Sequence, residues 1–225
     1  MDSRAFAPNL DALAARFRVY TPERRAHGRT PDVEGPITFE AMADDTVLFL
    51  ERVVRRPTRL MGMSDGATVA LMVALRRPDL ITRLVFVAGV FHHDGWWPQA
   101  IDPNQEPPEF LATSYAELSP DGAAHYQAVV DKLAQMHQIE PALTPEDLAT
   151  IQCRTLVMVG DDDEVRLEHA VELYRALPDA ELAVIPRTSH GLLVEKPELC
   201  NEMIVDFLAN DPAPTFDPIR RASPA

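Results

Sequence analysis

A serine stands between two glycines in the segment Gly62-Met63-Ser64-Asp65-Gly66, directly after an apolar run and directly before a helical pattern. A G-x-S-x-G pattern in this context predicts a sharp strand-to-helix turn, with glycines that avoid collisions with the neighbouring strand and helix. The exposed hydroxyl could attack a carbonyl carbon, and the N–H of Asp65 at the helix start could donate to the resulting oxyanion. The alternative is a serine that merely caps a helix.

Two later loops, each directly after an apolar run, carry the other groups that this reaction needs: Asp161, Asp162 and Asp163 after Thr155–Gly160, and His190 after Leu182–Pro186. An imidazole must take the proton from Ser64, and a carboxylate must hold that imidazole and stabilise its charged form. Taken singly, the histidine could be an ordinary loop residue and the aspartates a helix cap. Taken together, the order serine, acid, histidine predicts a catalytic triad, and the aspartate cluster leaves the acid undecided.

Five short aliphatic or β-branched runs alternate with longer helical patterns. This alternation predicts an α/β fold with a mostly parallel sheet and helices on both faces. The expected strands are Phe17–Tyr20, Arg59–Met63, Leu84–Ala88, Thr155–Gly160 and Leu182–Pro186. The expected helices are Pro8–Arg16, Phe39–Val54, Ala67–Arg77, Leu167–Ala176 and Pro197–Leu208.

The alternation of predicted strands and helices divides the chain into a core, an insertion and a tail. Residues 1–90 and 152–210 are expected to form the α/β core. Residues 91–151 are first rich in proline, histidine and tryptophan and then helical around Gly122–Gln138, which predicts a small lid insertion. Residues 211–225 carry several prolines and few large apolar side chains, which predicts a flexible tail.

Composition limits the class of protein and of partner. The 225 residues are 46% hydrophobic and 25% charged, as is typical of one globular domain. The formal charge of −14 makes binding to nucleic acid or to an acidic membrane surface unfavourable. No unbroken apolar run is long enough for a membrane span. The only cysteines, Cys153 and Cys200, favour a reducing cytoplasm.

Aromatic and sulfur-containing side chains near the serine allow two interpretations. Met63, Phe91, Trp96 and Trp97 could line a substrate pocket above Ser64. Such residues equally well pack a lid onto a core.

Histidines outside the triad are given no role. His92, His93 and Asp94 could suggest a metal site, but no further ligand joins them at a suitable spacing, so no metal is expected. No phosphate-binding or dinucleotide fingerprint is present, and the predicted chemistry needs no cofactor. Three further histidines lie in helical patterns and are interpreted as surface or boundary residues: His125, His137 and His169.

Three segments resemble the α/β-hydrolase superfamily: the turn Gly62–Gly66, the loop Gly160–Val165, and Ser189-His190-Gly191 followed by Glu195-Lys196-Pro197. The resemblance extends from about Ala5 to Leu208. In this family the acid usually stands three residues after the glycine that closes its strand, which implies Asp163. The triplet Ser64-Asp65-Gly66 is similar to that of small esterases of the valacyclovir hydrolase type.

This resemblance implies a two-step acyl transfer by Ser64, His190 and Asp163 on a small-molecule substrate. A small carboxylic ester, lactone or thioester is the expected substrate. The same triad could serve a carbon–carbon bond hydrolase or a lyase, and a non-catalytic binding relative is the third alternative. The sequence predicts no oligomeric state.

The amino terminus departs from the family pattern. Glu23–Thr30 is similar to a segment that follows an early strand, and members normally begin with further strands and a His-Gly-Gly-type loop that supplies a second oxyanion donor. Met1 stands where that loop should just have ended, so we expect a chain that lacks its amino-terminal strands. The gap would lie between the strands that match Phe17–Tyr20 and Arg59–Met63. Loss of one oxyanion donor would cost about 3 kcal/mol of transition-state stabilisation.

Overall fold

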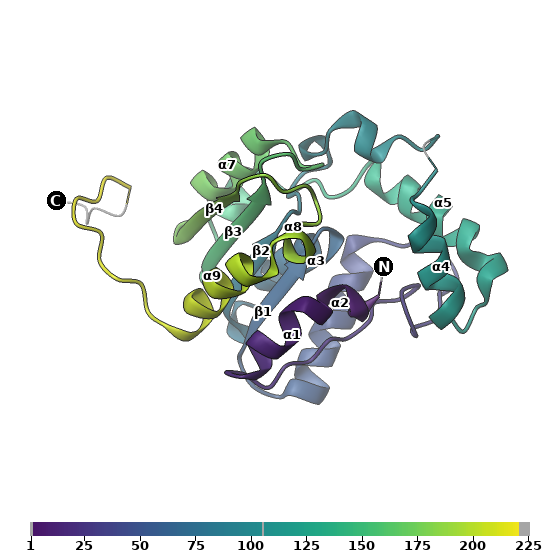
Figure 1. Cartoon of the computed structure of the whole chain (residues 1–225), viewed down its shortest axis with the longest axis horizontal. Helices are drawn as coiled ribbons and strands as arrows, with labels where there is room; N and C mark the ends of the chain where they lie inside the picture. Colours follow the sequence, from purple (N-terminus) through teal and green to yellow (C-terminus); the bar gives the residue numbers. More distant parts are fainter. Residues whose placement is uncertain (1, 105, 221–225) are drawn as a thin grey trace.

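The computed structural model describes residues 2–104 and 106–220, which form a parallel sheet with helices on both faces (Figure 1). The strands are β1 (Thr58–Met63), β2 (Ile81–Val87), β3 (Arg154–Gly160) and β4 (Ala180–Ile185). They lie in the order β1-β2-β3-β4, and every neighbouring pair is parallel. The predicted α/β class with a parallel sheet is therefore confirmed.

Helices flank this sheet in two layers. One layer contains α2 (Phe39–Phe49), α3 (Asp65–Arg76) and α7 (Leu167–Ala176). The other contains α1 (Ala7–Ala14), the short α8 (Leu192–Glu195) and α9 (Pro197–Ala209). Helix α7 has the predicted bounds, and α2 continues into a π-helical turn over Leu50–Val54.

Side chains alternate across the sheet because successive residues of a strand point to opposite faces. Leu84 and Phe86 of β2 pack in the cluster that includes α2, α3 and α7, whereas Val85 and Val87 pack with α1, α8 and α9. All four side chains are almost completely buried. Burial of both faces explains why the strands read as nearly continuous apolar runs.

One predicted strand is wrong. Residues 17–20 form neither strand nor helix, although Phe17 and Val19 still pack in the cluster that includes Met61 and Met63 of β1. A strand needs a neighbouring backbone with which to form hydrogen bonds. Within residues 2–104 and 106–220, β1 pairs only with β2. The apolar character of this segment therefore buries its side chains without adding it to the sheet.

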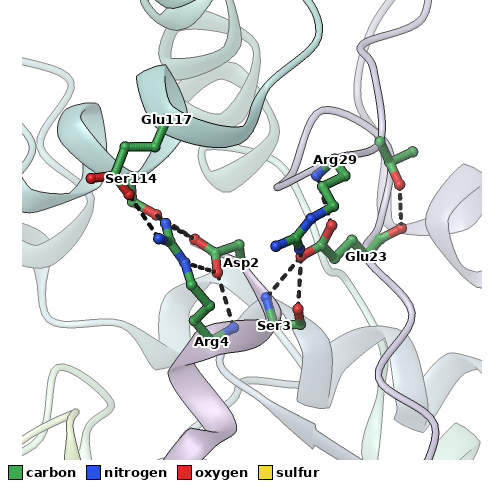
Figure 2. Close-up of polar contacts among 8 residues, drawn as sticks. Asp2, Ser3, Arg4, Glu23, Arg29, Ser114 and Glu117 are labelled. Carbon is green, nitrogen blue, oxygen red and sulfur yellow. Dashed lines mark hydrogen bonds and ion pairs between the residues drawn. The ribbon is translucent and has the colours of Figure 1, made fainter.

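Residues 91–151 connect β2 to β3 and contain α4 (Glu109–Leu118), α5 (Tyr126–His137) and α6 (Pro145–Leu148). In Figure 1, α4 and α5 lie together to one side of the sheet. Hydrogen bonds join α4 to the first turn of the chain, since Arg4 donates to Glu117 Oε2 at 2.7 Å and to Ser114 Oγ at 3.1 Å (Figure 2). The division into core and lid stays a prediction.

Residues 211–220 contain no helix or strand and are exposed throughout. Arg220 nevertheless returns to the core: its guanidinium lies 4.2 Å from the centre of the Tyr174 ring and donates to the Ala180 carbonyl at 3.1 Å. The described part of the predicted flexible tail thus has a defined contact. The rest of that prediction concerns residues 221–225, which lie outside the described residues.

Over the part of the chain that the structure covers, no helix is both long and apolar enough to cross a membrane. Cys153 and Cys200 are free thiols, and Cys200 is buried. The cytoplasmic location stays a prediction.

Gly62 and Gly66 differ in the space around them. A Cβ atom on Gly62 would lie 2.0 Å from the Gly66 carbonyl oxygen and 2.6 Å from Ala67 N, so only glycine lets β1 and α3 approach this closely. A Cβ atom on Gly66 would meet nothing within 4 Å. The expectation that both glycines avoid collisions is therefore wrong for Gly66.

We expect Gly62→Ala to lower the free energy of unfolding by about 2 kcal/mol, because the backbone of β1 or α3 must move. Gly66→Ala is the matched control, which should leave stability unchanged or raise it by up to about 1 kcal/mol because alanine favours the helix. Urea unfolding followed by circular dichroism measures both. Equal stability of the two variants would contradict this account of the turn.

Candidate active site

The predicted triad residues follow three different strands. Ser64 directly follows β1, Asp163 lies in the loop after β3, and His190 lies in the loop after β4. Because these strands are parallel, their carboxyl ends meet at one edge of the sheet. The fold thus brings all three loops to the same edge.

Ser64 occupies a strained backbone conformation, with φ 56° and ψ −130°. A non-glycine residue at positive φ costs of order 1–3 kcal/mol and persists only where its surroundings hold it. Here the Ser64 N–H donates to the Val87 carbonyl at 2.9 Å, and the Ser64 carbonyl accepts from Ala67 N at 2.8 Å. The end of β2 and the start of α3 therefore hold the turn on both sides.

Of the three clustered aspartates, Asp163 contacts the histidine. Its Oδ1 lies 2.8 Å from His190 Nδ1, and its side chain is fully buried. The same carboxylate accepts from the N–H groups of Gly160 at 3.0 Å and Val165 at 3.2 Å. Asp161 instead accepts from Thr188 N at 3.1 Å.

The environment of His190 favours its charged form. Burial opposes that form, but the hydrogen bond and the charge of Asp163 outweigh burial and raise the pKa of His190 above its ordinary value of 6.5. A carboxylate can only accept, so Nδ1 carries the hydrogen and Nε2 of the neutral ring is left to take a proton. Nε2 lies 3.9 Å from Glu164 Oε2.

The next feature is the relation between the side chains of Ser64 and His190. Among the residues that the structure describes, no hydrogen bond connects Ser64 Oγ with His190 Nε2. Catalytic hydrogen bonds are often long without substrate and tighten in the complex. The edge of the sheet therefore holds a hydrogen-bonded pair of Asp163 and His190 and, on the turn after β1, the candidate nucleophile Ser64.

Asp65 adds a contact that the sequence did not reveal. Its backbone N–H lies in the first turn of α3, where no earlier helical carbonyl can accept it, so it is available to an oxyanion. Its buried carboxylate forms a hydrogen bond of 2.9 Å with His137 Nε2 of α5. Burial lowers the pKa of His137, but the charge and hydrogen bond of Asp65 outweigh burial and raise it.

The interpretation of His137 as a surface or boundary residue is confirmed, because its side chain is 22% exposed, and its contact with Asp65 is an addition that this interpretation did not include. The two residues are 72 positions apart, and no local pattern relates them. His169 departs from the same interpretation, because it is 3% exposed and stacks on Phe91 at 4.1 Å between ring centres. Burial lowers the pKa of His169 to about 3, so the ring is neutral.

The four predicted pocket residues have different surroundings. Trp96 is buried, and its ring meets the His190 ring edge to face at 5.9 Å between centres. Phe91 is buried against His169, and Met63 is partly buried in the cluster that covers the α1 and α9 face. Trp97 is 43% exposed and lines a cavity of about 340 Å³ that also includes Asp163. Of the four, Trp96 is the one placed against the imidazole of the pair.

A second group of side chains has the composition of a metal site. His92, His93 and Asp94 offer ligand atoms that all lie within 4.8 Å of one another. His92 Nδ1 already accepts from the backbone N–H of Asp94 at 3.2 Å, so one of these atoms is engaged. The expectations of no metal and no cofactor stay predictions.

A model described as "Alpha/beta hydrolase family" matches residues 1–203. The chain is similar to "Putative carbamate hydrolase RutD" of a Caulobacter species, with 28% identity over 232 residues that cover 92% of this chain and 87% of the relative.

Solved structures share the fold. A mutant of the meta-cleavage product hydrolase CumD aligns with a TM-score of 0.78 and 19% identity, covering 92% of this chain and 86% of that one. The enol-lactonase from Burkholderia xenovorans LB400 aligns with a TM-score of 0.71 and 22% identity, covering 93% and 86%. At these sequence identities, the similarity to the two structures shows the fold alone. Because the family model covers most of the sequence, the chain belongs to the alpha/beta hydrolase family and is an enzyme of that hydrolase type.

Proposed function

We propose that this enzyme cleaves a small carboxylic ester, lactone or thioester through an acyl-enzyme intermediate. Ser64 is the nucleophile, His190 the general base and Asp163 the carboxylate that orients it. The observation that carries the proposal is the 2.8 Å hydrogen bond between buried Asp163 and His190, at the sheet edge where Ser64 stands on its strained turn.

The reaction has two half-reactions. Ser64 Oγ attacks the carbonyl carbon while its proton passes to His190 Nε2, and the bond to the leaving group breaks as His190 returns that proton to it. Water then attacks the acyl-enzyme, gives a proton to His190 and releases the carboxylic acid as Ser64 regains its hydrogen. Asp163 stays ionised throughout and stabilises the imidazolium.

Negative charge develops on the carbonyl oxygen in both half-reactions. The N–H of Asp65 is the donor assigned to it, because it starts α3 directly after the nucleophile. The Asp65 carboxylate is an acceptor and forms its hydrogen bond with His137.

A carbamate is the second candidate substrate. The similarity to proteins named as carbamate hydrolases favours it, and the same triad would form a carbamoyl-enzyme in place of an acyl-enzyme. Hydrolysis of a carbon–carbon bond and a lyase reaction remain alternatives for the same residues. The non-catalytic binding alternative does not fit an enzyme of this family.

A fluorophosphonate probe is expected to label the protein covalently, and an activated ester is expected to give a burst of product. Ser64→Ala should abolish labelling and lower kcat by roughly 10⁴-fold or more, because the nucleophile is removed. Ser119→Ala, at the end of α4, is the matched control and should label like the natural chain. Labelling that persists in a folded Ser64→Ala protein would assign the nucleophile elsewhere.

The pH profile tests His190 as the base. The imidazole must be neutral to accept a proton, so kcat/KM should fall as the pH drops through a pKa above 6.5. Asp163→Asn removes the charge that raises this pKa and leaves burial, which lowers it, so the acid limb should move to lower pH and kcat should drop by about 10⁴-fold. Asp162→Asn, an exposed neighbour, is the control. An unchanged acid limb in Asp163→Asn would contradict the assignment.

A further inference from the structure

The guanidinium of Arg24 is a buried cation without a hydrogen-bond partner among the described residues. Its Nη1 atom is inaccessible to solvent and has no hydrogen-bond partner. Among the described residues, no carboxylate oxygen lies within ion-pair distance of its guanidinium. The next residue differs, because Arg25 donates to both oxygens of Asp45 at 2.8 and 2.9 Å. A desolvated charge without a partner is costly, so this arrangement indicates a site for an anion.

Arg24 belongs to the group of charges around Asp65. Burial lowers the pKa of Arg24, and the charge of Asp65 opposes that change. Arg24 in turn lowers the pKa values of His27 and Asp65. The Oδ1 atom of Asp65 lies 2.9 Å from His137 Nε2, and among the described residues no hydrogen bond joins the Asp65 carboxylate to Arg24.

Trp96 provides a second donor without an acceptor. The residue is 5% exposed, and its indole Nε1 is buried without a hydrogen-bond partner. Buried tryptophan N–H groups usually find an acceptor. The Trp96 ring lies 6.2 Å from the His137 ring and 5.9 Å from the His190 ring, centre to centre. It therefore neighbours both the Asp65–His137 pair and the proposed base.

The loop that carries Arg24 is held in place. The carboxylate of Glu23 accepts from Ser3 Oγ at 2.7 Å and from Arg29 N at 2.6 Å, and the Glu23 carbonyl accepts from Thr30 Oγ1 at 2.9 Å (Figure 2). A binding group on a rigid loop loses little conformational entropy when it meets its ligand. These bonds hold the backbone directly before Arg24 in place.

We propose that Arg24, with the indole N–H of Trp96 as a second donor, binds a carboxylate of the substrate, so that the preferred acyl substrates are anionic half-esters. This inference rests on the proposed function. A guanidinium donates two parallel hydrogen bonds to a carboxylate, and both unpartnered groups are donors, so the ligand must supply acceptor oxygens. A doubly charged phosphate is disfavoured because Asp65 and Asp163 already place negative charge at this edge.

Rates of ester hydrolysis test whether the enzyme prefers anionic over neutral substrates. The monoethyl esters of succinate, glutarate and adipate are compared with neutral ethyl esters of matched length, with released ethanol as the readout. Charge-assisted hydrogen bonds predict that at least one half-ester has a kcat/KM about 10- to 100-fold higher, mainly through KM. Arg24→Met should remove this preference and Arg24→Lys should retain part of it, whereas Trp96→Phe should reduce it by less.

Arg16→Met is the matched control. Arg16 is exposed in the turn after α1, so this substitution should leave the preference for half-esters unchanged. A readout without turnover uses fluorophosphonate labelling: pentanoate should slow labelling of the natural chain more than pentanamide does, and Arg24→Met should remove the difference. No labelling at all would defeat the proposed function. Two results would overturn the assignment of Arg24 alone. One is normal labelling together with equal kcat/KM for anionic and neutral esters, and the other is an equal loss of kcat/KM on both classes in Arg24→Met.

Discussion

The hydrogen bonds of the buried Asp163 carboxylate hold together the loops at the carboxyl edge of the sheet. A desolvated anion persists only where hydrogen bonds replace its water. The N–H groups of Gly160 and Val165 and the Nδ1 of His190 do so here. These donors come from the end of β3, from the loop after it and from the loop after β4. Solvation of one side chain therefore holds two loops together and fixes which ring nitrogen faces the site.

The serine turn depends on a different constraint, which is close approach of backbone to backbone. Ser64 keeps its positive φ because its N–H is held by Val87 and because Gly62 lets α3 start directly against β1. The first residue of α3, Asp65, then supplies the backbone N–H that we assign to the oxyanion, and its carboxylate forms a hydrogen bond with His137 of α5. The position of residues 91–151 is therefore coupled to the geometry of the turn.

The net charge of the chain and the charged groups at the carboxyl edge of the sheet act over different distances. The chain carries a formal charge of −14, which opposes the approach of any anion at long range. At physiological ionic strength such fields are screened beyond about 8 Å. His137 Nε2 lies 2.9 Å from the Asp65 carboxylate, which raises the pKa of His137, and low solvent access strengthens such a short contact. The charge of Arg24 acts on the same carboxylate. In our proposal, recognition of the substrate depends on these local groups rather than on the net charge.

The sequence by itself determined the parallel sheet, the covering helices and the order of serine, acid and histidine, because hydrophobic periodicity and turn residues are local properties. It could not exclude residues 17–20 as a strand, since their composition suits burial and only a neighbouring backbone makes a strand. It could not relate Asp65 to His137 or His169 to Phe91. Those contacts join residues far apart in the chain, and only the tertiary structure decides them, because burial and charge pairing depend on which elements meet in space.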